Sequence, residues 1–480
     1  MTSSKIFWQP QLRMMDESNI DMLHNDALRI LSEIGLNVHH PAVRNQLKNA
    51  GAILDGEHRV RIPADLVAAS LDTAPKEVTV YDREGQAAMP LDPNQIYFGT
   101  GSDLIYTYDS TQNAQRFSLL ADVERSAKLC ERLDEIDFVM SFGLPSDVSN
   151  EDAEPNQYYA ILRNTKKPAI MTSFSGLEAL ERTHEMACLV AGGDQEFRKK
   201  PNYIMYGQFV SPLEHDFQAL ERLIFCADHR IPLIYVPTIM NGASGPITLY
   251  GSLSLALSET LAGLVMHQLQ SPGAPFITGA CVSPLDMKTG LFPYGSAEWR
   301  LNDLVMAEMS RHYGIPVFGT GGASDSKLVD AQAGAEYAGS LLAAAMAGTN
   351  LIHDVGYLNA GLTGSLESII LGADIIRWVK RYRKGIEVSE DTFGFKVIQD
   401  VGPAGEFLSH DHTYELLHQT TWIPLVMDHR DHDTWRADHA KDYAQQALEL
   451  AEDLLTNDLS DTLEPELDQE MQKLCNYQNS

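Results

Sequence analysis

The sequence predicts an α/β fold: a (β/α)8 TIM-like barrel that carries a small N-terminal α+β cap and a C-terminal helical appendage. Eight short apolar runs ending in Gly, Ser, Thr or Asn follow one another from residue 96, and each precedes a longer segment with helical spacing. Strands that alternate with helices indicate a parallel sheet, and eight consecutive units favour a closed barrel over an open doubly wound sheet. The 480 residues, 44% of them hydrophobic, suffice to bury a large core without disulfides.

Residues 1–95 are predicted to form the cap. Apolar residues recur with helical spacing between residues 20 and 34, and Gly35 follows them as a stop signal. Pro63 is a suitable first residue for a further helix, which would extend through Leu71. The remaining elements expected here are a short helix over 41–49 and short strands over 59–62 and 77–81.

Residues 96–385 are predicted to form the catalytic barrel. The expected strands are 96–101, 136–143, 169–175, 203–210, 233–238, 276–281, 317–321 and 350–355. The expected helices are 118–134, 152–164, 176–193, 214–229, 248–269, 295–313, 325–347 and 364–383. The first unit has an alternative, in which 96–101 belongs to the cap and pairs with 106–108 as a hairpin.

Residues 386–480 are predicted to form the helical appendage. The strand–helix rhythm ends after Gly385, and residues 386–409 look irregular. An amphipathic helix is indicated further along by an apolar stripe, which consists of Ala444, Ala447, Leu448, Ala451, Leu454 and Leu455. We expect this helix to pack on the barrel and the chain to fray after about residue 470.

The net charge excludes several classes of partner. With 36 Lys+Arg against 66 Asp+Glu the formal charge is −30, which argues against nucleic acid and against anionic membrane surfaces. No apolar run approaches the roughly 20 residues that span a bilayer, and the first residues lack the apolar segment of a secretory signal. Five scattered cysteines without a CxxC pair indicate reduced thiols, so we expect a cytoplasmic protein.

A barrel of this kind carries its active site at the C-terminal ends of its strands. These ends are rich in rings, amides, hydroxyls and glycines and poor in ionisable acids and bases. Aromatic faces attract a quaternary ammonium by about 0.5–2 kcal/mol per contact, so the composition favours a cationic, unreactive substrate. The candidate substrate-binding residues are Tyr97, Phe98, Phe142, Phe174, Tyr206, Gln208, Phe209, His353 and Tyr357. The alternative is that these rings only fill the layers of the barrel.

The remaining chemical signals are weaker. His353 could hydrogen-bond a carboxylate or polarise a leaving group, or it could be a structural histidine paired with a neighbour; no catalytic residue is assigned. Histidine clusters over 409–413 and 428–433 lie outside the strands without HExxH spacing, and His184-Glu185 is followed by Cys188 where a second His would stand. No tightly bound metal is therefore expected, and residues 319–327 match neither phosphate-loop pattern.

Several stretches resemble the trimethylamine methyltransferase family, whose members move a methyl group from methylated amines to a corrinoid protein. These stretches are LHNDALRILSEIGL (23–36), YFGTGSD (97–103), SDSK (324–327), DAQAG (330–334), AGTNLIH (347–353), GYLNAGLT (356–363) and GEFLSHDHT (405–413). The family's fold is a barrel of the kind predicted above. Its trimethylamine branch carries pyrrolysine, whereas this sequence shows only the standard twenty residues, so it is similar to the branch that acts on glycine betaine and related quaternary amines.

The resemblance implies a methyltransferase of methylamine metabolism, in methanogenesis or acetogenesis, that moves a methyl group from glycine betaine to the cobalt(I) of a corrinoid protein and releases dimethylglycine. The corrinoid (cobalamin) would be carried by a separate partner protein, and the leaving amine needs no general acid. Alternative donors are carnitine, proline betaine, γ-butyrobetaine and trimethylamine. A non-catalytic betaine-binding protein and a metal-dependent barrel hydrolase or lyase are the alternative functions. A homo-oligomer is expected because barrel enzymes with appendages commonly pair.

Overall fold

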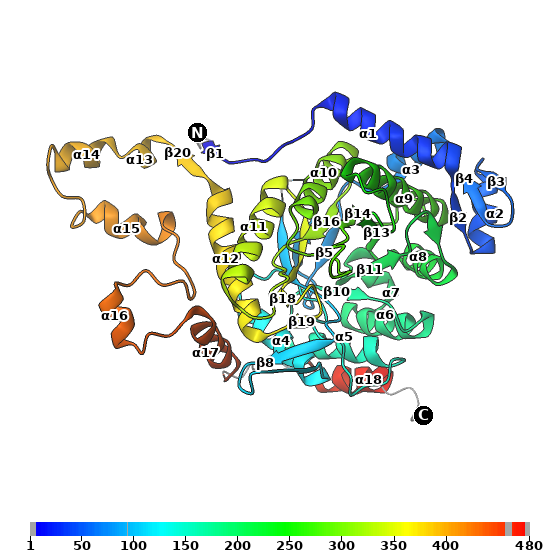
Figure 1. Cartoon of the computed structure of the whole chain (residues 1–480). Helices are drawn as coiled ribbons and strands as arrows, with labels where there is room; N and C mark the ends of the chain where they lie inside the picture. The colour runs from blue at the N-terminus through cyan, green and yellow to red at the C-terminus, as the bar shows by residue number, and fades with distance from the viewer. Residues whose placement is uncertain (1–5, 94, 457–462, 476–480) are drawn as a thin grey trace.

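The computed structural model describes residues 6–93, 95–456 and 463–475, and its centre is a closed barrel (Figure 1). Seven strands lie side by side in parallel pairs in this order: β10 (Ala169–Thr172), β11 (Tyr203–Phe209), β13 (Leu233–Asn241), β14 (Phe276–Gly279), β16 (Val317–Thr320), β17 (Leu351–Val355) and β7 (Tyr97–Thr100). Parallel bridges Gly99–Phe138 and Val139–Ala169 fill the eighth position and close the ring. The predicted (β/α)8 barrel is therefore confirmed.

The ring of helices follows the prediction closely. The helices are α4 (Leu120–Glu131), α5 (Ala153–Asn164), α6 (Leu177–Ala191), α8 (Phe217–His229), α9 (Leu249–Gln270), α10 (Ala297–Tyr313), α11 (Ala331–Ala347) and α12 (Leu366–Lys384). A short helix, α7 (Asp194–Lys199), interrupts the connection from α6 to β11. The hairpin alternative for the first unit is wrong, because β7 pairs with β17, while β8 (Tyr106–Asp109) pairs with β9 (Ala114–Phe117).

The N-terminal end of the barrel is closed by an apolar hairpin. Strands β5 (Thr79–Tyr81) and β6 (Ala87–Pro90) pair antiparallel, and Val80 and Met89 are fully buried. They share one apolar cluster with the inward-facing residues Ile170, Ile204, Ile234 and Ile277 of four barrel strands. The barrel interior is therefore packed from this end, as expected for a barrel of eight strands.

The first part of the chain packs against the outer helices. Its elements are β1 (Ile6–Trp8), α1 (Glu17–Arg29) continued by a π-helical turn (Ile30–Ile34), β2 (Leu36–Val38), α2 (Pro41–Asn49), β3 (Ile53–Asp55), β4 (Arg59–Arg61) and α3 (Ala64–Thr73). Gly35 ends the first helix with φ +75°, and a Cβ there would lie 2.5 Å from the Val60 carbonyl oxygen.

Helix α9 is long and apolar enough to cross a membrane by length and composition alone. In the structure α1, α2 and α3 cover one side of it and β13 the other, and 83% of its apolar window is buried. It is therefore a core helix of the barrel wall, and its apolar character comes from being enclosed on all sides.

Short strands surround the mouth of the barrel. Strands β18 (Tyr357–Leu358) and β19 (Thr363–Gly364) join β8 and β9 in a small sheet over the C-terminal ends of β7 and β17. Strand β15 (Cys281–Pro284) extends the pairing of β13, and β12 (Glu214–His215) pairs with β2.

The last part of the chain contains a short strand and several helices, and α17 and α18 are the helices described here as packing on the barrel. Strand β20 (Ile386–Val388) pairs with β1, and the following helices are α13 (Glu390–Phe393), α14 (Phe395–Val401), α15 (Asp411–Thr420), α16 (His432–Ala437), α17 (Tyr443–Thr456) and α18 (Pro465–Cys475). Helix α17 packs on α12 and α4 and buries Ala447 and Ala451, as the apolar stripe predicts. The expected fraying after residue 470 is wrong up to residue 475, because α18 packs on α5 and α6 and buries Met471 and Cys475. Residues 476–480 lie outside the described residues, and the division into three domains stays a prediction.

Candidate functional site

A cavity of about 600 Å³ opens at the C-terminal ends of the strands. Its walls come from β10, β11 and β17, from the loops after β7 and β15, and from α8. It is lined by Ser102, Asp103, Leu144, Thr172, Ser173, Phe174, Tyr206, Gln208, Gln218, Arg222, Tyr294, His353, Asp354, Tyr357 and Gly361. Because the other end of the barrel is filled by the hairpin, this mouth is where a ligand reaches the barrel interior.

Three tyrosine rings give the cavity an aromatic wall. Tyr357 is fixed by Ser102, whose backbone N–H donates to the phenol oxygen at 2.7 Å while the hydroxyl donates to the Ser102 carbonyl. Gly101 leaves room for this ring, since a Cβ there would lie 2.0 Å from it. Tyr294 meets Tyr357 edge to face with the centroids 5.9 Å apart, and Tyr206 packs against Phe318 at 4.9 Å.

His353 and Asp354 form a buried pair at the base of the mouth. His353 Nδ1 lies 2.8 Å from the Gly319 carbonyl oxygen and donates to it, so Nε2 is left as an acceptor 3.1 Å from Asp354 Oδ1. Burial lowers the pKa of His353 to about 3 and raises that of Asp354 well above its ordinary value. The low pKa of His353 keeps its ring neutral, and its Nε2 faces Asp354.

A carboxylate that the sequence did not single out projects into the same cavity. Asp103 Oδ1 accepts hydrogen bonds from Ser141 Oγ at 2.9 Å and Gln157 Nε2 at 3.0 Å, and Oδ2 accepts from Thr172 Oγ1 at 2.5 Å. These partners orient the carboxylate toward the cavity, and Asp103 is half-buried there. Asp103 and Asp354 are the carboxylates among the described residues that line the cavity.

The rim beside Phe174 carries a positive charge. Arg222 of α8 lines the cavity together with Gln208 and Gln218, and its Nη2 lies 3.5 Å from the Gln208 carbonyl oxygen. Glu154 of α5 holds the Phe174 loop, because it accepts hydrogen bonds from the backbone N–H groups of Phe174 and Ser175. Burial raises the pKa of Glu154 to about 7. The cavity is thus lined by an acidic group, Asp103, and by a basic group, Arg222.

Five of the nine sequence-predicted residues line the cavity: Phe174, Tyr206, Gln208, His353 and Tyr357. Four do not, for reasons of strand geometry. Tyr97 begins β7 at the opposite end of the barrel, where its hydroxyl donates to the Pro90 carbonyl and burial raises its pKa to about 12. Phe98 alternates with Tyr97 and points outward, with Lys380 Nζ 5.6 Å from its ring centroid.

Phe209 and Phe142 are the other two predicted residues that do not line the cavity. Phe209 differs from Tyr206 by an odd number of residues, so it leaves the opposite face of β11 and stacks on Tyr235 at 4.5 Å. Phe142 has a left-handed backbone with φ +58° and lies against Gly356 and Gly364. It borders a separate cavity of about 130 Å³ beneath β8.

Sequence reasoning missed Asp103, Arg222 and Tyr294 as site residues. Asp103 stands in the Gly-Ser-Asp end of the first strand and could have been found there, because it follows a strand directly. Tyr294 lies ten residues after β15, and its N–H is held at 2.9 Å by Asp325 from the loop after β16. Nothing in the local sequence shows that contact.

The comparisons with known proteins agree with this barrel. Residues 4–479 match the model of the family "Trimethylamine methyltransferase (MTTB)". The chain is similar to the glycine betaine methyltransferase of Desulfitobacterium hafniense (strain Y51), with 31% identity over 469 residues and 96% of each chain covered. It is also similar to the trimethylamine methyltransferase MttB of Methanosarcina thermophila, with 31% identity over 472 residues and 96% of each chain covered.

A solved structure shares the fold at low sequence identity. The monomethylamine methyltransferase MtmB of Methanosarcina barkeri superposes with a TM-score of 0.51 at 10% identity, covering 92% of this chain and 89% of that one. The sequence match extends over nearly the whole chain and includes both ends of the described barrel. The chain therefore belongs to the trimethylamine methyltransferase family and is a methyltransferase built on a (β/α)8 barrel.

Proposed function

We propose that this methyltransferase moves a methyl group from glycine betaine to the cobalt(I) of a separate corrinoid protein and releases dimethylglycine. The observation that carries the proposal is the mouth cavity, which is lined by three tyrosine rings, the Asp103 carboxylate and the Arg222 guanidinium. Glycine betaine is a zwitterion with a quaternary ammonium at one end and a carboxylate at the other. The polarity of the cavity matches that of the ligand.

In this proposal the ammonium end of the ligand lies beside Asp103. In this proposal the trimethylammonium group lies against Tyr206, Tyr294 and Tyr357, whose faces attract it by about 0.5–2 kcal/mol each. Asp103 supplies the opposite charge, and three donors hold its carboxylate in place. A cation without N–H groups needs no hydrogen-bond acceptor, which suits a wall of rings.

The carboxylate end belongs at Arg222 rather than at His353. The Nε2 atom of His353 already faces Asp354, and burial keeps that ring neutral. Arg222 is cationic and lies at the more exposed rim, beside the Gln208 and Gln218 amides. This assignment revises the sequence-based hypothesis that His353 holds the carboxylate.

The chemical step is an in-line displacement. The cobalt(I) lone pair forms the Co–C bond while the C–N bonding pair returns to nitrogen, so methyl-cobalt(III) and a neutral tertiary amine result. No proton is required for the amine to leave. The chain contributes positioning of one methyl group toward the open mouth and a tyrosine wall that excludes water from the ammonium. The corrinoid is a substrate that its own protein brings to the mouth.

The direct test is an incubation of the full-length protein with glycine betaine and a reduced corrinoid protein, followed by absorbance spectroscopy. We expect the cobalt(I) band to be replaced by that of methyl-cobalt(III), with one dimethylglycine per methyl transferred. Absence of transfer from every quaternary amine tried, including carnitine, proline betaine and γ-butyrobetaine, would contradict the proposal. Stoichiometric betaine binding without transfer would favour the non-catalytic betaine-binding protein.

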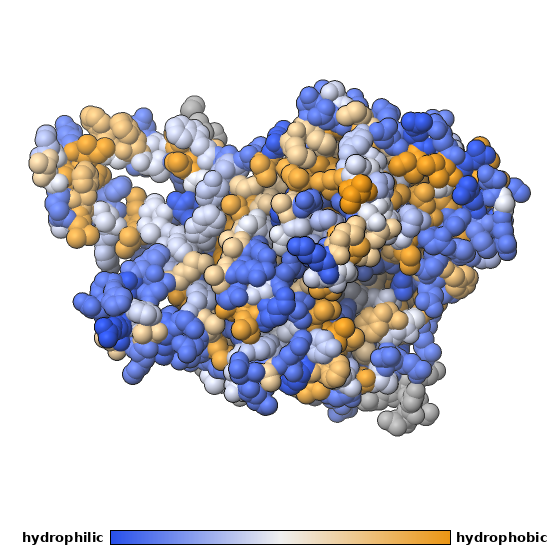
Figure 2. All heavy atoms as spheres, in the orientation of Figure 1, coloured by the Kyte–Doolittle hydropathy of each residue, from blue (hydrophilic) through white to orange (hydrophobic). Residues whose placement is uncertain are grey.

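We also propose that a second copy of the chain covers the segment from residue 386 to residue 424, here called the arm. Helices α13, α14 and α15 of the arm bury no residue, and they extend away from the barrel (Figure 1). Exposed apolar side chains gather on the arm (Figure 2), including Phe395, Leu408 and Tyr414, of which the last two are 83% and 86% exposed. Helices of four to ten residues are not stable without packing.

Two observations favour a second copy over the corrinoid protein. The arm leaves the barrel after α12, at the end opposite the mouth where the corrinoid must dock. The chain also carries an apolar groove of about 330 Å³, lined by Leu12, Leu342, Ala343, Met346 and Tyr382, which can accept an apolar side chain of another arm. Large apolar contacts are typical of permanent homo-oligomers, whereas a methyl acceptor must dissociate after each turnover.

Light scattering tests the arm. The wild-type protein is expected as a homo-oligomer, and Leu408→Asp is expected to shift it toward the monomer. Met287→Asp is the control, because Met287 is 69% exposed but lies outside the arm. A monomeric wild type at micromolar concentration would overturn this part of the proposal.

Five free thiols, four of them buried, suit the cytoplasm that we propose as the location.

A further inference from the structure

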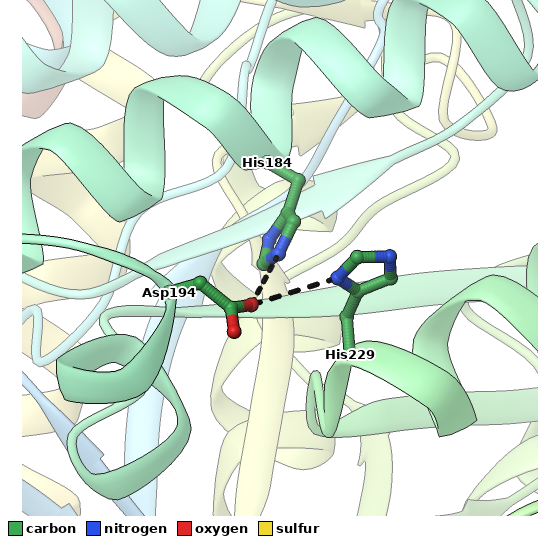
Figure 3. Close-up of side chains that lie close together, drawn as sticks. All are labelled: His184, Asp194 and His229. Carbon is green, nitrogen blue, oxygen red and sulfur yellow. Dashed lines mark ion pairs between the residues drawn. The ribbon is translucent and has the colours of Figure 1, made fainter.

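Three outer helices bring two histidines and an aspartate together on the barrel wall (Figure 3). His184 lies halfway along α6, Asp194 begins α7, and His229 ends α8. One ligand atom of each lies within 4.8 Å of the other two. None of the three lines the mouth cavity. Among the described residues, this is where such donor atoms converge, although the sequence predicts no metal site in the chain.

The distances are close to those of a coordinated ion. His184 Nε2 lies 4.0 Å and His229 Nδ1 lies 3.7 Å from the same oxygen, Asp194 Oδ1. Donors about 2.0–2.1 Å from a tetrahedral Zn²⁺ stand about 3.3 Å apart. The two distances to Asp194 must therefore close by less than about 1 Å, and the two imidazole nitrogens, which lie within 4.8 Å of each other, by at most about 1.5 Å. The buried Nδ1 of His229 makes no hydrogen bond, and Figure 3 shows it pointing at this carboxylate.

Neighbouring groups already orient these donors. Arg198 Nε donates to Asp194 Oδ2 at 2.8 Å, which leaves Oδ1 directed at the two imidazoles. The Tyr203 hydroxyl lies 3.3 Å from His184 Nδ1 and leaves Nε2 for the ion. Such outer hydrogen bonds fix the ring orientation and protonation of metal-binding histidines.

Cys188 is the fourth donor of the inferred site, although its Sγ lies outside the group of atoms that are all within 4.8 Å of one another. It follows His184 by one helical turn, and its Sγ lies 3.5 Å from His184 Nε2. Zn²⁺ displaces the proton of a thiol that it binds. Two imidazoles, one carboxylate and one thiolate make a donor set that prefers tetrahedral zinc.

We infer that His184, Cys188, Asp194 and His229 bind one Zn²⁺ ion, which joins α6, α7 and α8. A site closed by four protein ligands has no open position for a substrate, so its role is structural. It lies on the outside of the barrel and is separate from the methyl-transfer site. Each zinc ion bound releases the Cys188 proton to solvent.

The test uses the full-length protein stripped with a chelator and then titrated with ZnSO4. Elemental analysis is expected to give one zinc per chain, and the thermal midpoint is expected to rise with free zinc because binding stabilises only the folded state. Co²⁺ titrated in its place is expected to give the intense visible bands of a tetrahedral site together with a thiolate-to-cobalt charge-transfer band.

Variants separate this site from adventitious binding. His229→Ala is expected to weaken zinc binding by at least about 100-fold, and Cys188→Ser is expected to remove the charge-transfer band specifically. His432→Ala is the matched control, since His432 is 71% exposed beside Asp433 on α16 and belongs to no such group. Metal-free thermal midpoints of all variants check that each is folded.

Two results would overturn the inference: no zinc bound by the wild type at micromolar concentration, or unchanged affinity in His229→Ala. Both leave methyl transfer untouched, so they are distinguishable from failure of the proposed function. Methyl transfer by the zinc-free protein at low temperature is expected to equal that of the zinc-bound protein.

Discussion

The two ends of the barrel are built from similar residue types and behave in opposite ways. At the N-terminal end, Val80 and Met89 of the hairpin pack against inward-facing isoleucines, and Tyr97 contacts that plug. At the C-terminal end, Tyr206 projects from the same interior into an open cavity with Asp103 and Arg222. A tyrosine in the barrel interior therefore packs against the hairpin or faces the open cavity, according to the end of the strand at which it stands.

The largest effect is expected at the closed end. Met89→Ala leaves a cavity in a fully buried cluster and should lower the free energy of unfolding by about 3 kcal/mol. Methyl transfer by the folded fraction should stay within about twofold of wild type, because the plug does not reach the mouth. Chemical denaturation and a transfer assay at low temperature measure the two quantities. A loss of transfer without a loss of stability would contradict the division between the two ends.

The next effect concerns the acidic group that lines the mouth. Asp103→Asn removes the charge opposite the ammonium but retains an oxygen for Ser141 and Gln157. We expect kcat/KM for glycine betaine to fall roughly 100-fold, since a charge pair at this partial burial is worth a few kcal/mol. Asp109→Asn, at the nearby strand β8, is the control and should leave kcat/KM nearly unchanged. Equal losses in both variants would argue against a specific counter-charge.

A smaller effect on KM is expected to distinguish Tyr206 from Tyr97. Tyr206→Leu should raise the KM for glycine betaine about tenfold, because it removes one ring face from the ammonium. Tyr97→Leu should leave KM unchanged and lower only stability. Steady-state kinetics on the pair decides the point. If Tyr97→Leu changes KM as much as Tyr206→Leu does, position along the strand is not what assigns their roles.

The smallest change is expected in ligand affinity, on substitution of Arg222 at the rim of the cavity. Arg222→Leu should weaken the binding of glycine betaine by a factor of about 5–10, which is the contribution of an exposed charged contact. The binding of tetramethylammonium should not change, because that cation has no carboxylate. Arg125→Leu, an exposed arginine paired with Glu452, is the matched control. Competition binding with both ligands gives the ratio. A uniform loss for both ligands would place Arg222 in folding rather than in recognition.

The sequence predicted the barrel well because apolar strands and amphipathic helices repeat a local pattern eight times. It predicted the site only in part, because the direction of a side chain depends on strand alternation and length. Phe98 and Phe209 carry rings near the ends of strands, yet the period of two turns them outward. Phe142 keeps the inward phase, but its left-handed backbone redirects the ring.

Long-range contacts account for the rest of what was missed. Tyr294 reaches the mouth through a loop that Asp325 fixes from the next strand, and Asp103 is oriented by Thr172, which lies 69 residues away in the sequence. The His184–His229 group likewise joins three helices, and neither HExxH nor CxxC spacing marks it. Local patterns carry no information on such meetings, whereas the barrel topology determines them.

The central claim is that a methyl group leaves a quaternary ammonium held at this mouth and arrives on cobalt. One turnover with glycine betaine deuterated in its three N-methyl groups and one equivalent of cobalt(I) corrinoid protein tests it by mass spectrometry. We predict one trideuteromethyl group on cobalt and an equal amount of dimethylglycine that retains the other two labelled methyl groups. Unlabelled cobalt, or labelled betaine recovered intact from an otherwise active mixture, would contradict the account.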